Sequence, residues 1–307
     1  MGLATTVGVA AGLCACSSGG GSEQADAGSA PGSSAAPAEL TRKPLDEYSW
    51  QELAEISRKI EAAGGGDASA QVARDFGILA DDGSLAQQTK RLDMTNGLSI
   101  NTRVAGVMHD QKADGSGPCG LTLMTVGGVD LLPMNEAATS EGGWEASTLR
   151  AWLAQDGKAL LPDDLAGLVV PVQKMTNNTG ETRTTDSVTA TTDELWCFSA
   201  REVCGELDWY AKEYNGTFAS DMDRILNAEG DQYQWFAEAG VTPHGGEAAL
   251  SLEESTGRTA WWYRSPFPFD WTQTNMDDYF YQVKDTGYPE SLAAPESKAA
   301  VVFGFCV

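Results

Sequence analysis

Histidine and basic residues are scarce in this sequence. The 307 residues include only His109 and His244, and neither belongs to a His-x-x-x-His or His-Glu-x-x-His pattern. A histidine-rich zinc site is therefore not expected. The chain has 20 Lys and Arg against 44 Asp and Glu, with no Arg-rich run. Its formal charge of −24 repels phosphate backbones, so nucleic acid is excluded as an expected partner.

Several motifs that identify enzymes are also missing. The sequence has no Gly-x-Ser-x-Gly elbow for a hydrolase nucleophile and no P-loop. The calcium motifs of lectins, Glu-Pro-Asn and Trp-Asn-Asp, do not occur either. Many Asp and Glu residues could form a glycosidase pair, but nothing in one sequence selects two of them. These absences favour a protein without catalytic activity.

The first residues have the features of an export signal. The apolar run from Leu3 to Leu13 is too short for a stable membrane anchor and has the size of a signal-peptide core. Leu13-Cys-Ala-Cys16 follows and resembles a bacterial lipobox, although no Lys or Arg precedes the run. We therefore expect residues 1–15 to be a lipoprotein signal peptide and Cys16 to carry the lipid. An ordinary secretory signal is the alternative.

A polar segment separates this signal from the rest of the chain. Ser, Gly, Ala and Pro dominate residues 17–40, which cannot bury enough apolar surface to fold. We expect residues 16–44 to be a disordered linker. Two acyl chains on Cys16 would suffice for stable anchoring. The expected location is the outer face of the bacterial cell membrane, with the membrane as partner through the lipid.

Residues 45–82 are predicted to form a short helical region. Ser49-Trp-Gln-Glu52 fits a capping box, and apolar residues then recur at helical spacing until the glycines at 64–66. A second helix is expected over residues 68–76. The apolar stripe of this pair is too small to be stable alone. We therefore expect it to pack on the main domain, residues 83–307.

The main domain is predicted to be α+β, with a mixed, mostly antiparallel sheet and packed helices. Asn96-Gly97 lies between two extended segments and predicts a hairpin with a type I′ turn. Residues 142–153 have the pattern of an amphipathic helix, whereas the Asn- and Thr-rich residues 176–192 indicate a long mobile loop. Further strands are expected at residues 121–126, 168–174, 194–198, 278–284 and 299–307, and helices from residue 220 and over 231–239.

The segment from Thr259 to Pro266 is predicted to contain a central strand over residues 260–265. Strand alternation places Trp261 and Tyr263 on one face, and Trp262 and Arg264 on the other. Each Trp brings about 150–250 Å² to bury, so both faces should be covered. A buried Arg needs a partner, and we expect a structural ion pair for Arg264. A ligand contact is the alternative.

Two further features concern cysteine and calcium. Beyond Cys16, the expected mature chain has Cys119, Cys197, Cys204 and Cys306, of which Cys197 and Cys204 are the first candidates for a disulfide, with free thiols as the alternative. Asp110 and Asp114 lie in a loop that faintly resembles a calcium site. Lys112 occupies an oxygen-ligand position there, and no Glu closes the loop. We expect a polar turn and no cofactor, with calcium as the alternative.

An aromatic and polar segment follows the Trp-Trp strand. A Trp beside carboxylates and amides is typical of sugar sites, where ring stacking combines with hydrogen bonds. The alternative is that Trp271 folds back and closes the open end of the core. The candidate ligand-binding residues are Arg264, Asp270, Trp271, Asn275, Asp277 and Tyr279.

A set of motifs in one order resembles a known family. They are Gly142-Gly-Trp-Glu-x-Ser-x-Leu-Arg-x-Trp-Leu153, Leu161-Pro162, Lys174-x-Thr-Asn-Asn178, Thr191-Thr-Asp-x-Leu-Trp196, Ser199-x-x-Glu-Val203, Glu229-Gly-x-Gln-Tyr233 and Trp261-Trp-x-Arg-Ser-Pro266. Over about residues 48–307 they resemble domain of unknown function 6273, found in surface lipoproteins of Gram-positive gut bacteria. The family's closing strand usually reads Gly-Val-Arg-Pro-Ala-Phe, and Val302 replaces that Arg here.

This resemblance implies no established activity. It implies a fold similar to C-type-lectin-like and sulfatase-modifying-factor domains, an analogy of architecture that does not carry function. Together with the expected anchor and the aromatic segment, it favours a non-catalytic module that binds a glycan or another surface ligand. One alternative is an extracytoplasmic enzyme with an acidic or cysteine-based site in the same cleft. Another is a structural adhesin that contacts protein.

Overall fold

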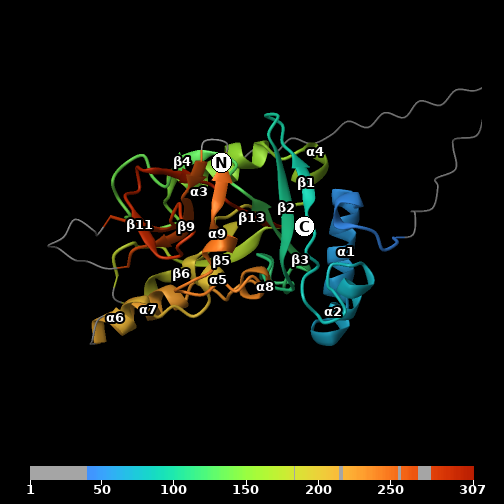
Figure 1. The fold of residues 1–307 in the computed structure, drawn as a ribbon, viewed down its shortest axis with the longest axis horizontal. Helices are drawn as coiled ribbons and strands as arrows, with labels where there is room; N and C mark the ends of the chain where they lie inside the picture. The colour runs from blue at the N-terminus through green and yellow to red at the C-terminus, as the bar shows by residue number, and fades with distance from the viewer. Residues whose placement is uncertain (1–39, 183, 214–216, 255–256, 269–277) are drawn as a thin grey trace, which may run out of the picture. The chain divides into compact units, whose positions relative to one another are not determined.

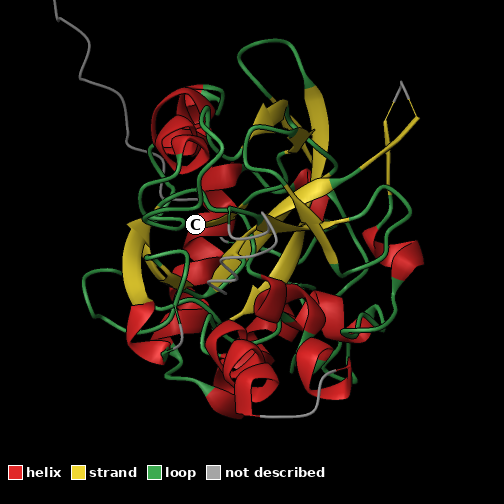
Figure 2. Ribbon diagram, turned by 90° about the vertical axis from the view of Figure 1, so that its left-hand side faces the viewer, coloured by secondary structure: helices red, strands yellow, loops and turns green. Residues whose placement is uncertain are grey.

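Two antiparallel-rich sheets form the centre of the molecule (Figures 1 and 2). The computed structural model describes residues 40–182, 184–213, 217–254, 257–268 and 278–307. The four-stranded sheet has the order β1 (Lys90–Asp93), β2 (Ser99–Val107), β3 (Leu121–Val126) and β13 (Gly304–Cys306), with antiparallel neighbours throughout. The five-stranded sheet has the order β11 (Ser291–Ala293), β10 (Phe280–Val283), β9 (Trp261–Pro266), β12 (Lys298–Ala300) and β4 (Leu131–Pro133).

Only the pairing of β9 with β12 is parallel among the described strands. Two separate hairpins add β5 (Val172–Asn177) with β6 (Val188–Asp193), and β7 (Leu252–Glu254) with β8 (Gly257–Thr259). The described strands are therefore mostly antiparallel, as predicted.

The helices are α1 (Trp50–Ala62), α2 (Gly66–Asp75), α3 (Thr148–Trp152), α4 (Asp163–Ala166), α5 (Ala200–Cys204), α6 (Trp209–Glu213), α7 (Thr217–Asn227), α8 (Gln234–Glu238) and α9 (Glu247–Leu250). Together with the sheets, they confirm the predicted α+β class.

Helix α1 begins at the capping box that the sequence predicts. The Ser49 hydroxyl accepts a hydrogen bond from the Glu52 amide at 3.2 Å, and the Glu52 carboxylate accepts one from the Ser49 amide at 2.7 Å. Its apolar face is buried and includes Trp50, Leu53 and Ile56. Figure 1 shows α1 and α2 beside the four-stranded sheet, while α5 to α8 gather along another side of the molecule.

The last residues of the chain complete both sheets. The single strand predicted at residues 299–307 is instead two strands, β12 in the five-stranded sheet and β13 in the four-stranded sheet. Between them, Val301 bonds to the backbone of Val129 and Asp130, and the carbonyl of Phe303 accepts from the Thr125 amide. The run is apolar and buried on every side, which lets it pass from one sheet to the other without exposing side chains.

One turn and the start of one helix differ from prediction. The β1–β2 hairpin has the three-residue loop Thr95–Gly97, because Met94 still bonds to Leu98 and only Gly97, at φ 87°, has a positive φ. This is a turn closed by a left-handed glycine rather than a two-residue type I′ turn. The predicted helix over 142–153 begins only at Thr148, with Ser147 as its N-cap. Gly142 and Gly143 have φ values of 78° and 54°, outside the right-handed helix.

The region around residues 168–192 also differs from prediction. The strand predicted at 168–174 starts at Val172, because Pro171 has no amide hydrogen to continue a ladder. The segment predicted as a long mobile loop contributes the end of β5 and all of β6 except Asp193, in a hairpin paired from Val172↔Asp193 to Asn177↔Val188. Its Thr residues fit a pleated, half-buried surface. Asn and Thr content was therefore a poor indicator of mobility.

Gly120 is where α1 meets the sheet most closely. A Cβ atom on Gly120 would lie 2.1 Å from the Ser57 carbonyl oxygen of α1, and the Ser57 hydroxyl accepts from the Leu121 amide at 3.0 Å. We predict that Gly120→Ala lowers the free energy of unfolding by about 1–3 kcal/mol, the usual cost of overpacking. Gly167→Ala is the matched control, since no atom lies within 4 Å of its Cβ position. Urea unfolding of both variants measures the difference, and equal midpoints would contradict it.

Candidate functional site

Strand β9 lies at the centre of the five-stranded sheet, as the sequence predicts, and all six of its residues are buried. The rings of Trp261 and Tyr263 contact each other on one face, with centroids 5.3 Å apart. The Trp261 indole donates to the Leu250 carbonyl at 2.9 Å, and the Trp262 indole to the Leu132 carbonyl at 2.8 Å. Both faces are therefore covered, and both Trp donors are satisfied.

Arg264 forms the predicted ion pair, with Glu202. Its Nη1 and Nη2 atoms bond to the two Glu202 carboxylate oxygens at 2.5 and 2.9 Å. The remaining donors reach the Thr176 hydroxyl and the carbonyls of Met175, Cys197 and Glu229. All five guanidinium hydrogens are thus used inside the protein, and the side chain is fully buried. Arg264 lies in the interior, where it has no free donor for a ligand.

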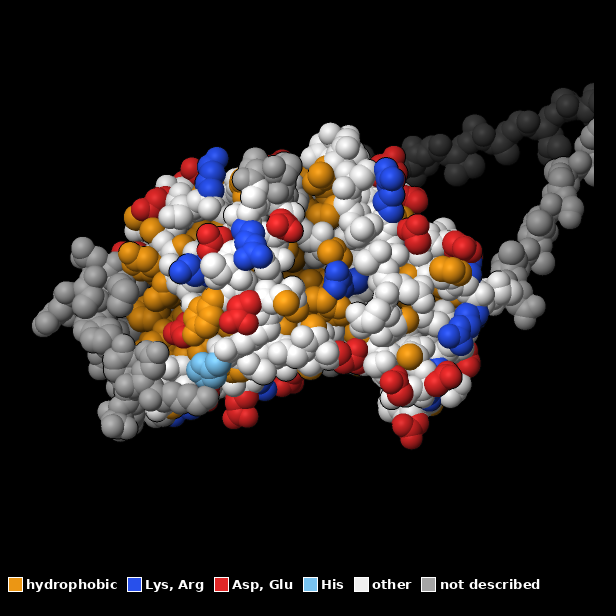
Figure 3. All heavy atoms as spheres, in the orientation of Figure 1, with side chains coloured by type: hydrophobic (Ala, Val, Ile, Leu, Met, Phe, Trp, Pro, Cys, Tyr) orange, Lys and Arg blue, Asp and Glu red, His pale blue; other side chains and the backbone are white. Residues whose placement is uncertain are grey.

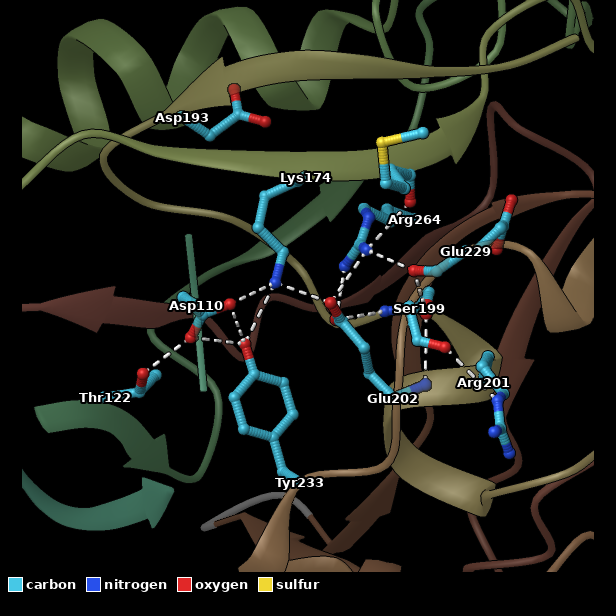
Figure 4. A network of polar contacts seen from close by, with 12 residues as sticks. Asp110, Thr122, Lys174, Asp193, Ser199, Arg201, Glu202, Glu229, Tyr233 and Arg264 are labelled. Carbon is cyan, nitrogen blue, oxygen red and sulfur yellow. Dashed lines mark hydrogen bonds and ion pairs between the residues drawn. The ribbon is translucent and has the colours of Figure 1, made fainter. Parts of the chain in front are cut away.

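The ion pair continues into a larger buried network (Figure 4). Lys174 on β5 points between two carboxylates, with Nζ 2.5 Å from Glu202 and 2.6 Å from Asp110. The Tyr233 hydroxyl donates to Asp110 at 2.8 Å. Burial opposes ionisation of Glu202, but the Arg264 and Lys174 charges outweigh it, and the pKa of Glu202 is lowered. Removing one partner of such a buried pair typically costs about 3–5 kcal/mol.

Glu229 is the exception in this region, because no cation pairs with its carboxylate oxygens among the described residues. Its side chain is fully buried and accepts from the Asn177 amide at 2.9 Å and from the Ser265 hydroxyl. Burial raises the pKa of Glu229 from 4.5 to about 7. The folded protein therefore holds this proton over a pH range in which the unfolded chain releases it.

We predict that Glu229 contributes stability that is lost as pH rises from about 5 to 7.5. The unfolded carboxyl ionises near pH 4.5 and the folded one near pH 7, so the folded state binds more protons in this window. The loss is about 3 kcal/mol for a shift of this size. Glu229→Gln, which keeps an acceptor and a polar partner for Ser265, should flatten the dependence. Urea unfolding at several pH values measures it. Exposed Glu47→Gln is the charge-matched control, and an unchanged slope in Glu229→Gln would contradict the assignment.

The calcium candidates are not brought together at a binding surface. Asp110 is buried and its oxygens accept from Lys174, Tyr233 and Thr122, so none is directed at the loop. Asp114 is exposed and accepts from the Ser116 amide at 2.9 Å, which is the predicted polar turn. Within the described ranges, no group of three or more His, Cys, Asp or Glu residues could hold a metal ion.

The predicted disulfide is not formed. Cys197 and Cys204 are both free and buried, and burial raises the pKa of each thiol to about 12. The Cys204 sulfur contacts the Tyr263 hydroxyl at 3.4 Å, on the side of β9 opposite to Arg264. The Cys197 carbonyl instead accepts from Arg264. Closeness in sequence therefore did not bring the two sulfurs together: Cys204 is the last residue of α5, whereas Cys197 precedes the N-cap of that helix, Ser199.

Most of the predicted ligand-binding residues cannot be placed. Asp270, Trp271, Asn275 and Asp277 lie outside the described residues. Tyr279 is described and half-buried, and its carbonyl accepts from the Phe267 amide at 2.8 Å. The aromatic sugar site expected from the sequence therefore stays a prediction, and of its members the structure places only Arg264 and Tyr279.

A different surface has the features of a binding site. A groove of about 240 Å³ lies between the four-stranded sheet, α8 and the segment around α9, and a second hollow of about 150 Å³ adjoins it. Figure 3 shows hydrophobic side chains gathered in a hollow near the middle of this face, where Figure 1 places α8, α9 and β2. Arg103 on β2 and Trp235 on α8 line both spaces, so this pair divides them.

Arg103 packs against Trp235, with its guanidinium carbon 4.3 Å from the centre of the ring. Its Nε atom is buried and has no hydrogen-bond partner. Burial lowers the pKa of Arg103 from its ordinary value. A guanidinium nevertheless keeps its charge at neutral pH. Sequence reasoning missed this site, because Arg103 lies in a strand without a distinguishing motif and its aromatic partner Trp235 is far along the chain.

The comparisons with known proteins are consistent with the motifs. No curated protein and no solved structure gives a significant match to the chain. No helix in the described part is both long and apolar enough to cross a membrane. The family model described as "Domain of unknown function (DUF6273)" matches residues 122–300, a span that contains Trp235 but not Arg103. Because that span is more than half of the 307 residues, the chain belongs to this family of domains of unknown function.

Proposed function

We propose that the protein is a non-catalytic binding module for an extracytoplasmic ligand, a glycan or another surface molecule. The observation that carries the proposal is the pair of hollows that share Arg103 and Trp235. A concave site with apolar walls and a few polar groups is the usual form of a ligand pocket. The groove combines apolar walls from Met124 and Trp261 with polar Thr125 and Ser251.

The arrangement of charges also supports binding over catalysis. Asp110, Lys174, Glu202 and Arg264 are buried and satisfy one another, so they are not poised to exchange protons with a substrate. This buried network is therefore not available as the acid and base of a reaction at the groove. In this proposal the paired network supports the walls, and the groove holds the ligand.

Trp235→Ala should abolish or weaken ligand binding. The ring supports Arg103 and lines both hollows, and aromatic and Arg anchors carry most of the energy at recognition sites. The measurement is isothermal titration against a panel of host and cell-wall glycans and small surface metabolites, for which we expect a loss of at least about tenfold, or 1.4 kcal/mol. Exposed Tyr288→Ala is the aromatic control.

Trp271→Ala distinguishes the two candidate sites on the same panel. If binding depends on Trp271 and not on Trp235, the site lies in the segment predicted from the sequence, and the groove is not it. Absence of heat with every ligand would argue against a binding module altogether.

We further propose that a lipid on Cys16 holds the module at the outer face of the bacterial cell membrane. The lipobox-like Leu13-Cys-Ala-Cys16 and the polar segment after it support this. In a bacterial host, Cys16→Ala should move the protein from the membrane fraction to the soluble fraction and remove its acyl label. Cys14→Ala is the matched control and should leave both unchanged. An unlabelled wild-type protein would overturn the anchor without affecting the binding proposal.

A further inference from the structure

Arg103 has an unusual electrostatic position for this chain. The sequence contains 44 Asp and Glu residues, but none of those that the structure describes lines either hollow. Among the described residues, Arg103 is the one charged side chain that lines them. The described residues give its guanidinium no ion pair and no hydrogen bond, and its Nε atom is buried. A buried donor without a partner costs about 1–3 kcal/mol, more for a charged group. A bound anion would remove that cost.

The contact with Trp235 holds the Arg103 charge beside the groove. The guanidinium carbon lies 4.3 Å from the ring centre, within the range of cation–π contact. The N–H donors of a guanidinium lie in its plane and point outward from its edge. That edge matches a carboxylate, which can accept two parallel hydrogen bonds. The geometry therefore favours a planar, two-oxygen anion.

The walls beyond Arg103 are largely apolar. Met124 is its register partner on β3 and lines the same groove, with Leu250, Leu252, Trp261 and Val302. At about 240 Å³ the groove is smaller than the roughly 300–1,000 Å³ of pockets for drug-sized ligands. It suits a body of one ring or a short chain. Such walls gain about 25 cal/mol for each Å² of apolar surface that they remove from water.

We propose that the groove beside Arg103 binds a carboxylate attached to a short apolar body, such as an aromatic or short-chain acid. The carboxylate pairs with the edge of the guanidinium, and the apolar body lies against Met124, Leu250 and Trp261. The inference rests on the proposed function, because it names the ligand class of the same site. It narrows that proposal, since a neutral glycan would leave the charge unpaired.

Two pairs of probes test the ligand class. Phenylacetate and phenylacetamide have the same apolar ring but differ in charge. Glucuronate and glucose differ in charge in the same way but have a polar sugar ring. Isothermal titration of the full chain should show phenylacetate binding more tightly than the other three probes. Arg103→Gln should weaken phenylacetate binding by about 10- to 100-fold, the range for hydrogen bonds to a charged group, and leave phenylacetamide unaffected. Arg103→Lys keeps the charge without the planar guanidinium, so its affinity for phenylacetate should lie between those of the wild type and Arg103→Gln.

Arg91→Gln is the matched control, because it removes the same charge from an exposed site on the neighbouring strand. Thermal melting checks folding, and Arg103→Gln should lower the melting temperature only slightly, because the described residues give Arg103 no ion pair or hydrogen bond and the variant loses only the contact with the Trp235 ring. Equal binding of phenylacetate and phenylacetamide would contradict the proposed role of the carboxylate. Binding of glucuronate but not of phenylacetate would contradict the proposed apolar body. Tight binding of neutral glycans that Arg103→Gln does not affect would sink the inference and leave the binding module intact. The absence of binding by every probe and every glycan would contradict both the ligand class and the proposed binding module.

Discussion

The buried pairing of Arg264 with Glu202 is the constraint on which the rest of the structure depends. Arg264 lies on the central strand of one sheet, Glu202 is the N3 residue of α5, and the other Arg264 donors hold the backbone of β5 and the segment before α8. One side chain therefore joins three segments that lie far apart in sequence. Its geometry is strict, because each of its three nitrogens has at least one acceptor inside the protein.

Lys174 extends this constraint to the other sheet. It links Glu202 to Asp110, and Asp110 accepts from Thr122 on β3. The series of polar contacts thus extends from β9 to β3, and the Tyr233 hydroxyl also donates to Asp110. Buried ion pairs are weak evidence for stability, but they are intolerant of misalignment. In this protein we infer that they set the position of the two sheets, and so the shape of the groove between β2, β3 and α8.

Local features of this fold could be predicted from the sequence, because their causes lie within a few residues. The capping boxes at Ser49 and Ser199 and the alternation on β9 are of this kind. The division of the last strand could not, since its partners lie far along the chain. The β5–β6 hairpin was missed because its Asn and Thr residues are also typical of loops. The paired state of Arg264 followed from burial alone, but the identity of Glu202 required the fold. Arg103 and Trp235 could not be found, because nothing in either local pattern predicts that they touch.

The position of β13 has a consequence for how the protein folds. Thr122 on β3 contacts Cys306 on β13, 184 residues later, and Phe305 packs against Trp50 of α1 at 6.0 Å between ring centres. Contacts at such separation require closure of a very long loop, so domains that depend on them reach the native state slowly. Until that loop closes, β3 has an unpaired edge that could join another chain. Until β13 pairs with β3, we therefore expect the domain to fold slowly and to remain open to association with other chains.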